Sequence, residues 1–465
     1  MKKYFPFILT VLLAGCVSSK PPESQPSPQT EETQFSQSQP SLPQGAAPLS
    51  IRRPVDYDIR DSVDNVGNLY IKYYSQLPSV LTFVNKDGSV TVCSSDENAK
   101  TTHVYEFDLS LKETKDFSFQ NEFSTLGAFT KDDEGNYYFF YAERARNQNT
   151  ENMAVVSYSR QGEKINTYKL KAQAANSFGG IRVPFNAGTC RIELSECMLA
   201  VYFSREMFNG HQASYGFILD KDSFIRIDKG ASTHPDIVGD TQMPYSSHSF
   251  NQFILPVEGG FLFADHGDAY PRCFAFAKLI YRSNTRNNTI RLDAFRFSGG
   301  IGVFPTYAQM GGLAKTSSGY IFAGTYGGDR NSARNLFILT FDENLGTCSD
   351  PVYLTSYTAD DGHAGHPKIV SLENGRCLVL WEQFGFTTQS AVVDVDDPTE
   401  YLSTFALIIN EKGEPVSGVR RLDGVRLNMN DTLRYNPRNG RVYWSINDSG
   451  RSFITYALDT SGFSR

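Results

Sequence analysis

The chain has 465 residues, of which 13% are aromatic, with 25 Tyr and 34 Phe but only 2 Trp. Its formal net charge is −7 and it contains no block of Lys and Arg, which argues against nucleic acid or an anionic membrane surface as a partner. Tyr and Phe are enriched in strands, and helical periodicity is absent beyond the first residues, so the composition favours an all-β protein.

The first residues combine positive charge with a short apolar run. Lys2 and Lys3 precede an apolar stretch from Phe5 to Leu13, which is shorter than the roughly 20 residues of a membrane-spanning helix. The stretch has the length of the hydrophobic region of a secretory signal, about 7–15 residues. We therefore predict that residues 1–15 are a signal peptide.

The apolar run ends in Leu13-Ala14-Gly15-Cys16, which resembles the lipobox of bacterial lipoproteins. In that family the cysteine is diacylated, the peptide is cut before it and the new amino group is acylated. The resemblance implies lipidation of Cys16 and attachment to a membrane through the lipid anchor. The alternative is an ordinary signal peptide with an incidental cysteine. In Gram-negative lipoproteins an aspartate after the cysteine favours the inner membrane; Val17 stands there instead, so we expect a lipid-anchored protein of the cell envelope, at the outer membrane.

A segment rich in Pro, Ser, Gln, Thr and Glu covers residues 16–50. Phe35 is its only aromatic residue, so the segment cannot bury enough apolar surface to offset the entropy of ordering. We predict a disordered tether over residues 16–50 that joins the lipidated cysteine to a single β-domain, residues 51–465.

One pattern recurs through this domain: a turn that ends in glycine, followed by an alternating aromatic and aliphatic strand. The glycines are Gly67, Gly135, Gly260, Gly319, Gly375 and Gly440. They recur about every sixty residues, with one double interval in which Glu196 to Phe203 fits the missing place. An apolar strand precedes each segment and hairpin turns follow it, which makes four antiparallel strands per unit. The repeat predicts a seven-bladed β-propeller of four-stranded antiparallel blades.

The last unit contributes only three strands, which end with Phe453 to Leu458. We expect the segment near Val55 to Ile59 to add the fourth strand, because this would close the ring and remove an open sheet edge. Six or eight blades, and two β-sandwich domains, are the alternatives.

Two cysteines are candidates for a disulfide. Cys190 and Cys197 flank Arg191 to Glu196, which we interpret as a hairpin turn that would let the two thiols face each other. Two buried free cysteines are the alternative. The sequence has no CxxC motif and no Cys/His spacing typical of zinc, and we expect neither a metal nor a cofactor.

Polar residues gather at positions that the predicted blades bring to one face. The start of the first strand and the end of the second lie on the same face because the strands are antiparallel, and loops on a rigid scaffold usually carry function. The candidate binding residues are His211, His248, Asp265, His266, Asp268, Tyr270, Arg272, Asp329, Arg330, His363, His366 and Glu382.

These candidates also have structural interpretations. Arg272 could pair with Asp268 inside a tight turn, and His363 and His366 could be solvent-facing loop residues. As metal ligands the histidines would need a carboxylate to complete a mixed nitrogen and oxygen site, and their spacing is not diagnostic of one.

Three functions are open. The first is a binding lipoprotein whose loop-rich face holds a carbohydrate, peptide or envelope-protein partner, which the tether, the acidic charge and the lack of a nucleophile motif favour. The alternative is an extracytoplasmic hydrolase or lyase that acts on glycans, with Asp265 or Glu382 as acid or base if burial raises its pKa. The third is an assembly factor for envelope proteins.

Overall fold

The computed structural model describes residues 47–59, 77–173, 179–186, 188–228, 245–281, 288–303, 305–329, 331–385, 400–427, 429 and 431–463. These residues form strands β1 to β28 and no helical element, and no helix among them is long and apolar enough to cross a membrane. The predicted signal peptide, Cys16 and the segment that follows Gly67 lie outside the described residues.

All strand pairs are antiparallel, and most sheets have four strands. One sheet contains β2 (Val80–Val84), β3 (Val90–Asp96), β4 (Thr101–Phe107) and β5 (Glu113–Gln120). The next contains β6 (Thr125–Lys131), β7 (Tyr137–Ala142), β8 (Glu151–Tyr158) and β9 (Lys164–Lys171). Two more contain β18 (Ala308–Lys315), β19 (Gly319–Tyr326), β20 (Asn335–Asp342) and β21 (Val352–Tyr353), and then β22 (His363–Ser371), β23 (Cys377–Phe384), β24 (Tyr401–Ile409) and β25 (Arg420–Leu422).

The remaining strands form one large and one composite sheet. The large sheet contains β10 (Val183–Pro184), β11 (Cys190–Ser195), β12 (Met198–Glu206), β13 (Gln212–Asp220), β14 (Ser247–Val257), β15 (Gly260–Ala269), β16 (Arg272–Ile280) and β17 (Asn288–Arg296). The composite sheet combines β26 (Arg434–Asn436), β27 (Arg441–Asn447) and β28 (Ser452–Asp459) with β1 (Leu49–Pro54) from the start of the domain.

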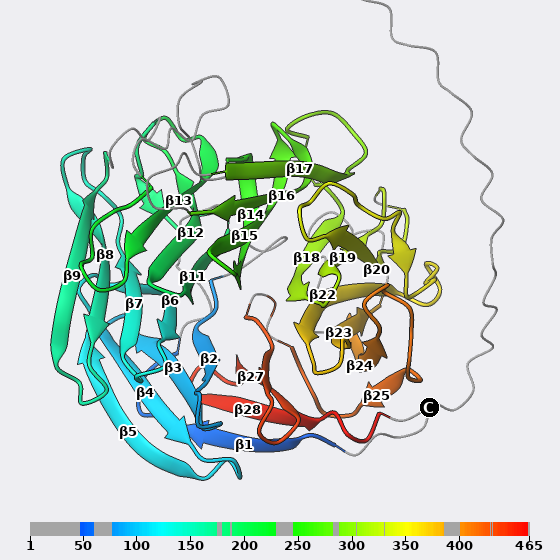
Figure 1. The fold of residues 1–465 in the computed structure, drawn as a ribbon, viewed down its shortest axis with the longest axis horizontal. Coiled ribbons are helices and arrows are strands. Elements are labelled where there is room, and N and C mark those ends of the chain that lie inside the picture. The colour runs from blue at the N-terminus through cyan, green and yellow to red at the C-terminus, as the bar shows by residue number, and fades with distance from the viewer. Residues whose placement is uncertain are drawn as a thin grey trace, which may run out of the picture. The chain divides into compact units, whose positions relative to one another are not determined.

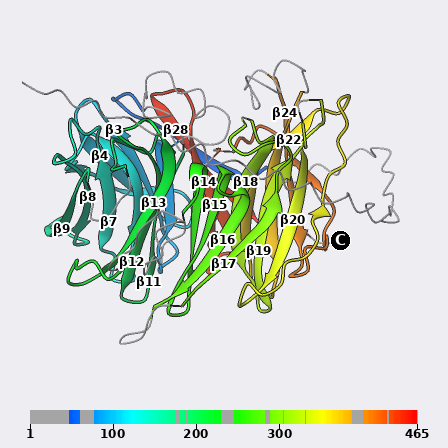
Figure 2. The same cartoon turned by 90° about the horizontal axis from the view of Figure 1, so that it is seen from above.

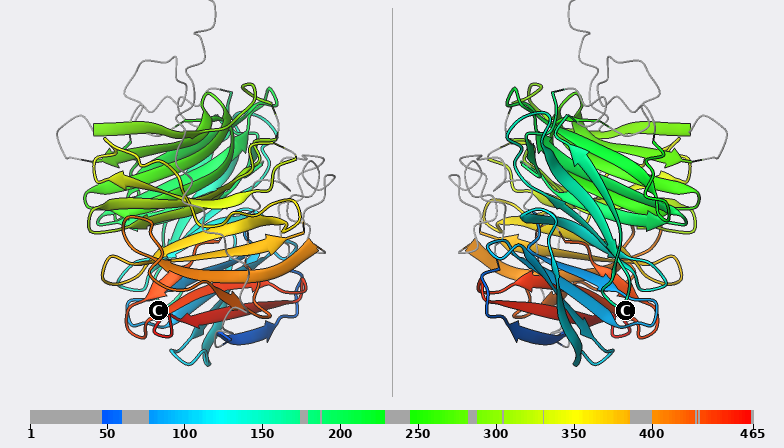
Figure 3. Two further views of the ribbon diagram at one scale, coloured as in Figure 1. Left: turned by 90° about the vertical axis from the view of Figure 1, so that its right-hand side faces the viewer. Right: turned by 90° about the vertical axis from the view of Figure 1, so that its left-hand side faces the viewer.

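The sheets follow one another around a common centre (Figure 1). The strands β2, β6, β11, β14, β18, β22 and β26 each contact the next in this order, and β26 contacts β2. Seen from the sides, the strands cross this unit from one face to the other (Figures 2 and 3). The prediction of an all-β, propeller-like fold built from four-stranded antiparallel sheets is confirmed.

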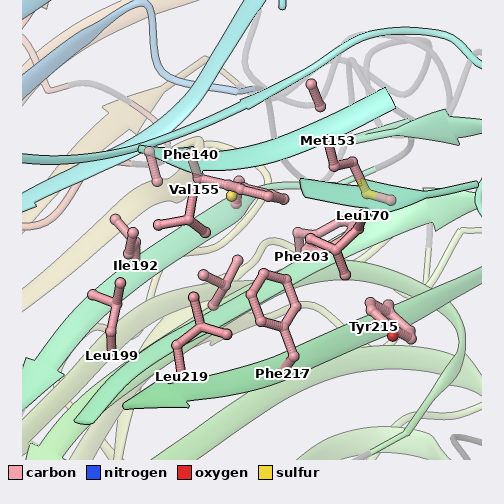
Figure 4. Packing of buried hydrophobic residues seen from close by; sticks show 14 of the residues in the cluster. Phe140, Met153, Val155, Leu170, Ile192, Leu199, Phe203, Tyr215, Phe217 and Leu219 are labelled. Atoms are coloured by element: carbon pink, nitrogen blue, oxygen red, sulfur yellow. The ribbon is translucent and has the colours of Figure 1, made fainter. Parts of the chain in front are cut away.

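Apolar side chains fill the space between successive sheets, and the period of two along each strand decides which side they face. Leu199, Val201 and Phe203 of β12 pack into a cluster shared with β7 and β8, whereas the alternate residues of β12 pack toward β15. The ring of Phe140 lies 5.3 Å from that of Phe203 in this cluster (Figure 4). Full burial of each such side chain stabilises the fold by roughly 2 kcal/mol.

Two of the recurring glycines, Gly260 and Gly319, begin the second strand of their sheet for a steric reason. A Cβ at Gly319 would lie 2.0 Å from the backbone oxygen of Phe341, and one at Gly260 would lie 1.9 Å from that of Leu279. Both oxygens belong to the third strand of the same sheet. Only glycine therefore allows the second and third strands to approach each other at these positions.

The ring closes with a different segment from the one expected. β1 pairs with β28, from Leu49 opposite Ala457 to Pro54 opposite Ser452, so the expectation that Val55 to Ile59 forms the strand was wrong. That segment only continues the contact through single backbone bonds to the turn before β28. Strand β1 starts at Leu49, inside the stretch predicted as tether, because backbone pairing orders it although it has little apolar content.

The predicted disulfide does not form. Arg191 to Ser195 belong to β11, and the turn lies at Glu196 and Cys197, since Ser195 pairs with Met198. Cys190 is therefore opposite Phe203, far from the turn. Among the described residues, Cys190 is a buried free thiol and Cys197 an exposed one.

Candidate functional site

Two irregular strands carry the histidines that lie closest to acidic residues. β14 and β22 each shift register near their start. His366 lies within the shift of β22 and His248 just before that of β14. Their φ angles are 47° and 51°, in the left-handed region that non-glycine residues seldom adopt. β-bulges of this kind redirect side chains and are frequent beside functional sites.

His248 is paired with a buried carboxylate. Its Nδ1 lies 2.9 Å from Oδ1 of Asp268, which is at the end of β15. Asp268 is almost fully buried whereas the His248 side chain is partly exposed. This contact fixes the orientation of the imidazole.

His211 lies beside this pair. Its ring centroid is 4.7 Å from that of His248, and its Nε2 is 2.6 Å from the hydroxyl of Ser247. Burial, and then the neighbouring His248, lower the pKa of His211. The two imidazoles can therefore lie close together without carrying two charges near neutral pH.

The loop between β17 and β18 is held by Arg272. The guanidinium donates to the backbone oxygens of Ser298 at 2.8 Å, Val303 at 2.7 Å and Pro305 at 3.3 Å. A backbone hydrogen bond from Gly302 to Asp268, at 2.8 Å, fixes the same loop to β15. Arg272 thus binds the loop, while the Asp268 carboxylate accepts from His248. A fork of five donors allows one arginine to fix an irregular backbone.

This fixed loop presents apolar side chains to solvent. Ile301 and Val303 are 58% and 55% exposed, and Tyr270, at the turn between β15 and β16, is 64% exposed. A Cβ at Gly302 would lie 3.8 Å from ring atoms of His248, so the loop lies against that imidazole. We call His248, Tyr270, Ile301 and Val303 the rim patch.

Seven of the predicted binding residues are buried, including His363 and His366, which are therefore not solvent-facing loop residues. Asp265 and His266 have no exposed surface. Asp265 accepts hydrogen bonds from Tyr202 and, at 2.6 Å, from Ser249, and burial raises the pKa of its carboxyl group. His266 is fully buried among phenylalanine rings and bonds to Thr306 at 2.8 Å. Adjacent residues of a strand point to opposite sides, and β15 is covered on both sides, so neither side chain reaches the surface.

A second group centres on Glu382. Its Oε2 lies 2.5 Å from Nδ1 of His366, and its Oε1 accepts from Nε of Arg426 at 2.8 Å and from the backbone N of Leu427 at 2.9 Å. Burial alone would raise the pKa of Glu382, but His366 and Arg426 outweigh it and hold that pKa below its usual value. The buried carboxylate therefore stays ionised and orients the imidazole of His366.

The other predicted residues divide between these groups and the surface. His363 stacks on Phe384 with centroids 5.9 Å apart, close to His366. Asp329 accepts from the backbone N of Asn331 at 2.8 Å and caps a turn, and Arg330 lies outside the described residues. Within the part of the chain that the structure describes, no three His, Cys, Asp or Glu side chains are arranged to hold a metal ion.

The structure adds residues that the sequence did not suggest. Ile301 and Val303 are apolar, and apolar residues are ordinarily assigned to the core. Their signal was local: glycines surround Ile301 in the run from Ser298 to Gly302, which is typical of a loop. Arg426 was missed because nothing in its local spacing links it to Glu382.

Comparison with known proteins assigns no family to this chain. No protein-family model and no curated protein matches the chain. A solved prolyl endopeptidase is similar over 83% of this chain and 47% of its own, with 10% identity and a TM-score of 0.46, so this chain spans less than half of that enzyme. A member of the DUF4221 family from Bacteroides vulgatus matches 89% of this chain and 98% of its own, at 10% identity and a TM-score of 0.38. The α-L-arabinanase of Penicillium chrysogenum matches 78% and 99%, at 12% identity and a TM-score of 0.36. These likenesses assign no activity to this chain.

Proposed function

We propose that this chain is a lipid-anchored protein of the cell envelope whose seven-bladed β-propeller binds a carbohydrate, peptide or protein partner at the rim patch. The count of seven is supported by the large sheet, in which β13 and β14 share a single pair, Ala213 with Ser247. Division at this weak pair leaves β14 to β17 as a complete four-stranded blade. The first strands of the resulting blades then succeed one another around the ring.

The observation that carries the binding function is the fixed loop. Isolated exposed aliphatic residues are common, but Ile301 and Val303 stand on a backbone that Arg272 holds at several carbonyls. A side chain on a rigid backbone loses little entropy when it binds. Two aliphatic groups beside a tyrosine and an imidazole favour a peptide or protein partner over a glycan, since apolar contacts and aromatic anchors dominate such interfaces.

Affinity measurements on rim-patch variants test this function. We expect Ile301→Ser combined with Val303→Ser to weaken binding of the partner at least about tenfold, since each anchor contributes about 1–2 kcal/mol. The unfolding temperature should stay unchanged, because these side chains are exposed. Binding would be screened on peptide and glycan arrays with the purified protein and then measured by calorimetry.

Ile165→Ser is the matched control, because Ile165, 50% exposed, is a similarly exposed aliphatic residue on the outer strand β9. Equal loss of binding in this control, or full binding in the double variant, would contradict the rim patch as the site.

A second candidate function is a glycan-acting hydrolase or lyase at the Glu382 group. It is supported by the oriented pair of Glu382 and His366, an arrangement typical of a general base and its positioning carboxylate. His366 would be the base, because both oxygens of Glu382 already accept hydrogen bonds. Glycan fragments released when the purified protein is incubated with glycans would favour this candidate over simple binding.

Membrane attachment has its own test. We expect Cys16→Ser to abolish incorporation of a labelled fatty acid and to release the protein from the membrane fraction, because two or three acyl chains give stable anchoring and none gives no anchoring. Cys197→Ser, which removes the exposed thiol of the β-domain, should keep both the label and the membrane. A Cys16→Ser protein that remained labelled and membrane-bound would refute the lipid anchor.

A further inference from the structure

Charged side chains from distant sheets meet at the centre of the ring. Nη2 of Arg434, on β26, lies 3.0 Å from Oε1 of Glu193, on β11, and Nε of Arg434 donates to the backbone oxygen of Thr82, on β2, at 3.2 Å. These are the innermost strands of three sheets, so a side chain that joins them crosses the axis region.

Three more charged residues belong to this group. Arg191 is on β11, Lys368 on β22 and Asp431 just before β26. The charge of Asp431 acts on both Arg191 and Lys368, and that of Arg191 acts on Lys368. They are only 6%, 2% and 4% exposed. We call Arg191, Glu193, Lys368, Asp431 and Arg434 the axial cluster.

Two buried polar atoms of the axial cluster have no hydrogen-bond partner among the described residues. Nε of Arg191 donates to the backbone oxygen of Gln252 at 2.8 Å, but Nη2 has no acceptor among the described residues. Oδ1 of Asp431 accepts from the backbone N of Thr432, but Oδ2 has no donor among them. Within the described part of the chain, Lys368 donates to the backbone oxygen of Met429 at 2.7 Å. Leaving such charged groups unmatched in the interior is costly.

The charges define what would complete these contacts. Arg434 neutralises Glu193 and Arg426 neutralises Glu382, which leaves Arg191 and, when its amine is protonated, Lys368 against the anion Asp431. The remaining group is therefore cationic by one charge and offers donors on one side and an acceptor on the other. The net positive charge disfavours a metal cation. A zwitterion would leave that charge unbalanced, and a simple carboxylate has no proton to donate to Asp431.

We propose that the axial cluster binds a small hydroxycarboxylate anion. Its carboxylate would accept from Nη2 of Arg191 and from Nζ of Lys368, as a charge-assisted contact. Its hydroxyl would donate to Oδ2 of Asp431. This site is separate from the rim patch, so neither proposal depends on the other.

Proton uptake is a built-in signature of this site. Burial, followed by the neighbouring Arg191, lowers the pKa of Lys368 to about 7, while Asp431 and Glu382 act in the opposite direction. A bound carboxylate adds a negative charge beside the amine and raises that pKa again. Above about pH 7, binding should therefore take up protons.

Calorimetry on the full-length protein in detergent tests the proposal, with glycolate, acetate and glycine as probes. We expect glycolate to bind with proton uptake, seen as a dependence of the binding heat on the ionisation enthalpy of the buffer. Acetate should bind at least about tenfold more weakly, because it lacks one charge-assisted hydrogen bond. Glycine should not compete. No binding of glycolate, or equal affinity for glycolate and either other probe, would overturn the proposal.

Variants assign the contacts. Lys368→Met should lose the binding and the proton uptake, and Asp431→Asn should lose the preference for glycolate over acetate. Lys278→Met is the matched control, because Lys278 is also buried and donates to a backbone oxygen, that of Glu343 at 2.7 Å. Retention of glycolate binding in Lys368→Met would overturn the site. If a variant does not fold, proton uptake by the unmodified protein on binding of glycolate still tests the proposal, and binding without proton uptake above about pH 7 would overturn it.

Discussion

A chain that lacks residues 47–54 should unfold at a much lower temperature than the complete chain and should associate with itself. These residues include β1, whose six residues pair with Ser452 to Ala457 of β28. Loss of this pairing, at about 1 kcal/mol for each hydrogen bond, costs on the order of 5 kcal/mol. It also removes the contacts of Arg53 with Glu113 and Asp116, 2.7 Å each, which connect β1 to the outer strand of the next sheet.

The self-association has a separate cause. Without β1, the strand β28 becomes an edge with a row of unpaired backbone groups, which is a template for pairing with another chain. Differential scanning calorimetry at a fixed scan rate and light scattering measure the two effects. A chain that lacks residues 20–44 is the control and should behave as the parent does. Equal unfolding temperatures and a monomeric species in both deletions would contradict the closing role of β1.

The stability of this protein should fall steeply in mild acid because of His266. Burial, and then the nearby Arg272, lower the pKa of His266 to about 3, whereas an unfolded histidine has a pKa of about 6.5. The folded state thus keeps the ring neutral while the unfolded state binds a proton. The contribution is fully present above about pH 6.5 and is lost as the pH falls toward about 3, which costs about 2 kcal/mol at about pH 5.

The variant His266→Phe should remove this part of the pH dependence. Phenylalanine suits the surrounding rings of Phe250, Phe274 and Phe297, so the variant should lose only the hydrogen bond to Thr306, about 1 kcal/mol, near neutral pH. Unfolding temperatures at about pH 7.5 and about pH 5 give the comparison. His103→Phe, at a half-buried histidine whose pKa is also lowered, should change the slope less. An identical slope in His266→Phe and the parent would show that His266 does not cause it.

The sequence predicts most of the fold because the fold depends on local signals. The close third strand requires glycine at Gly260 and Gly319. Gly135, Gly375 and Gly440 lie in the turn before the second strand with positive φ angles of 88°, 66° and 66°, which also favour glycine. The closing strand has no comparable signal. In β1 only Ile51 and Arg53 are even half-buried, and backbone pairing and ion pairs hold the rest. Hydrophobic periodicity cannot detect a strand of this kind.

The candidate site was predictable in its members but not in their roles. His248 and Asp268, like His366 and Glu382, were expected on one face because strand starts and strand ends meet there. Whether a side chain such as His266 faces the core depends on its register, and a shift of one residue reverses it. The axial cluster left no trace in the sequence, because strands far apart in the chain supply it.

The pairing of β1 with β28 joins segments separated by about four hundred residues. Contacts between residues so far apart in the sequence form slowly in folding. The ring also cannot close before β28 has been synthesised, because β28 is the partner of β1. A product cut short before Ser452 would not be a smaller working protein, because its first strand would have no neighbour to receive it. The two ends of the domain therefore depend on each other: a substitution that weakens either β1 or β28 is expected to destabilise the whole ring.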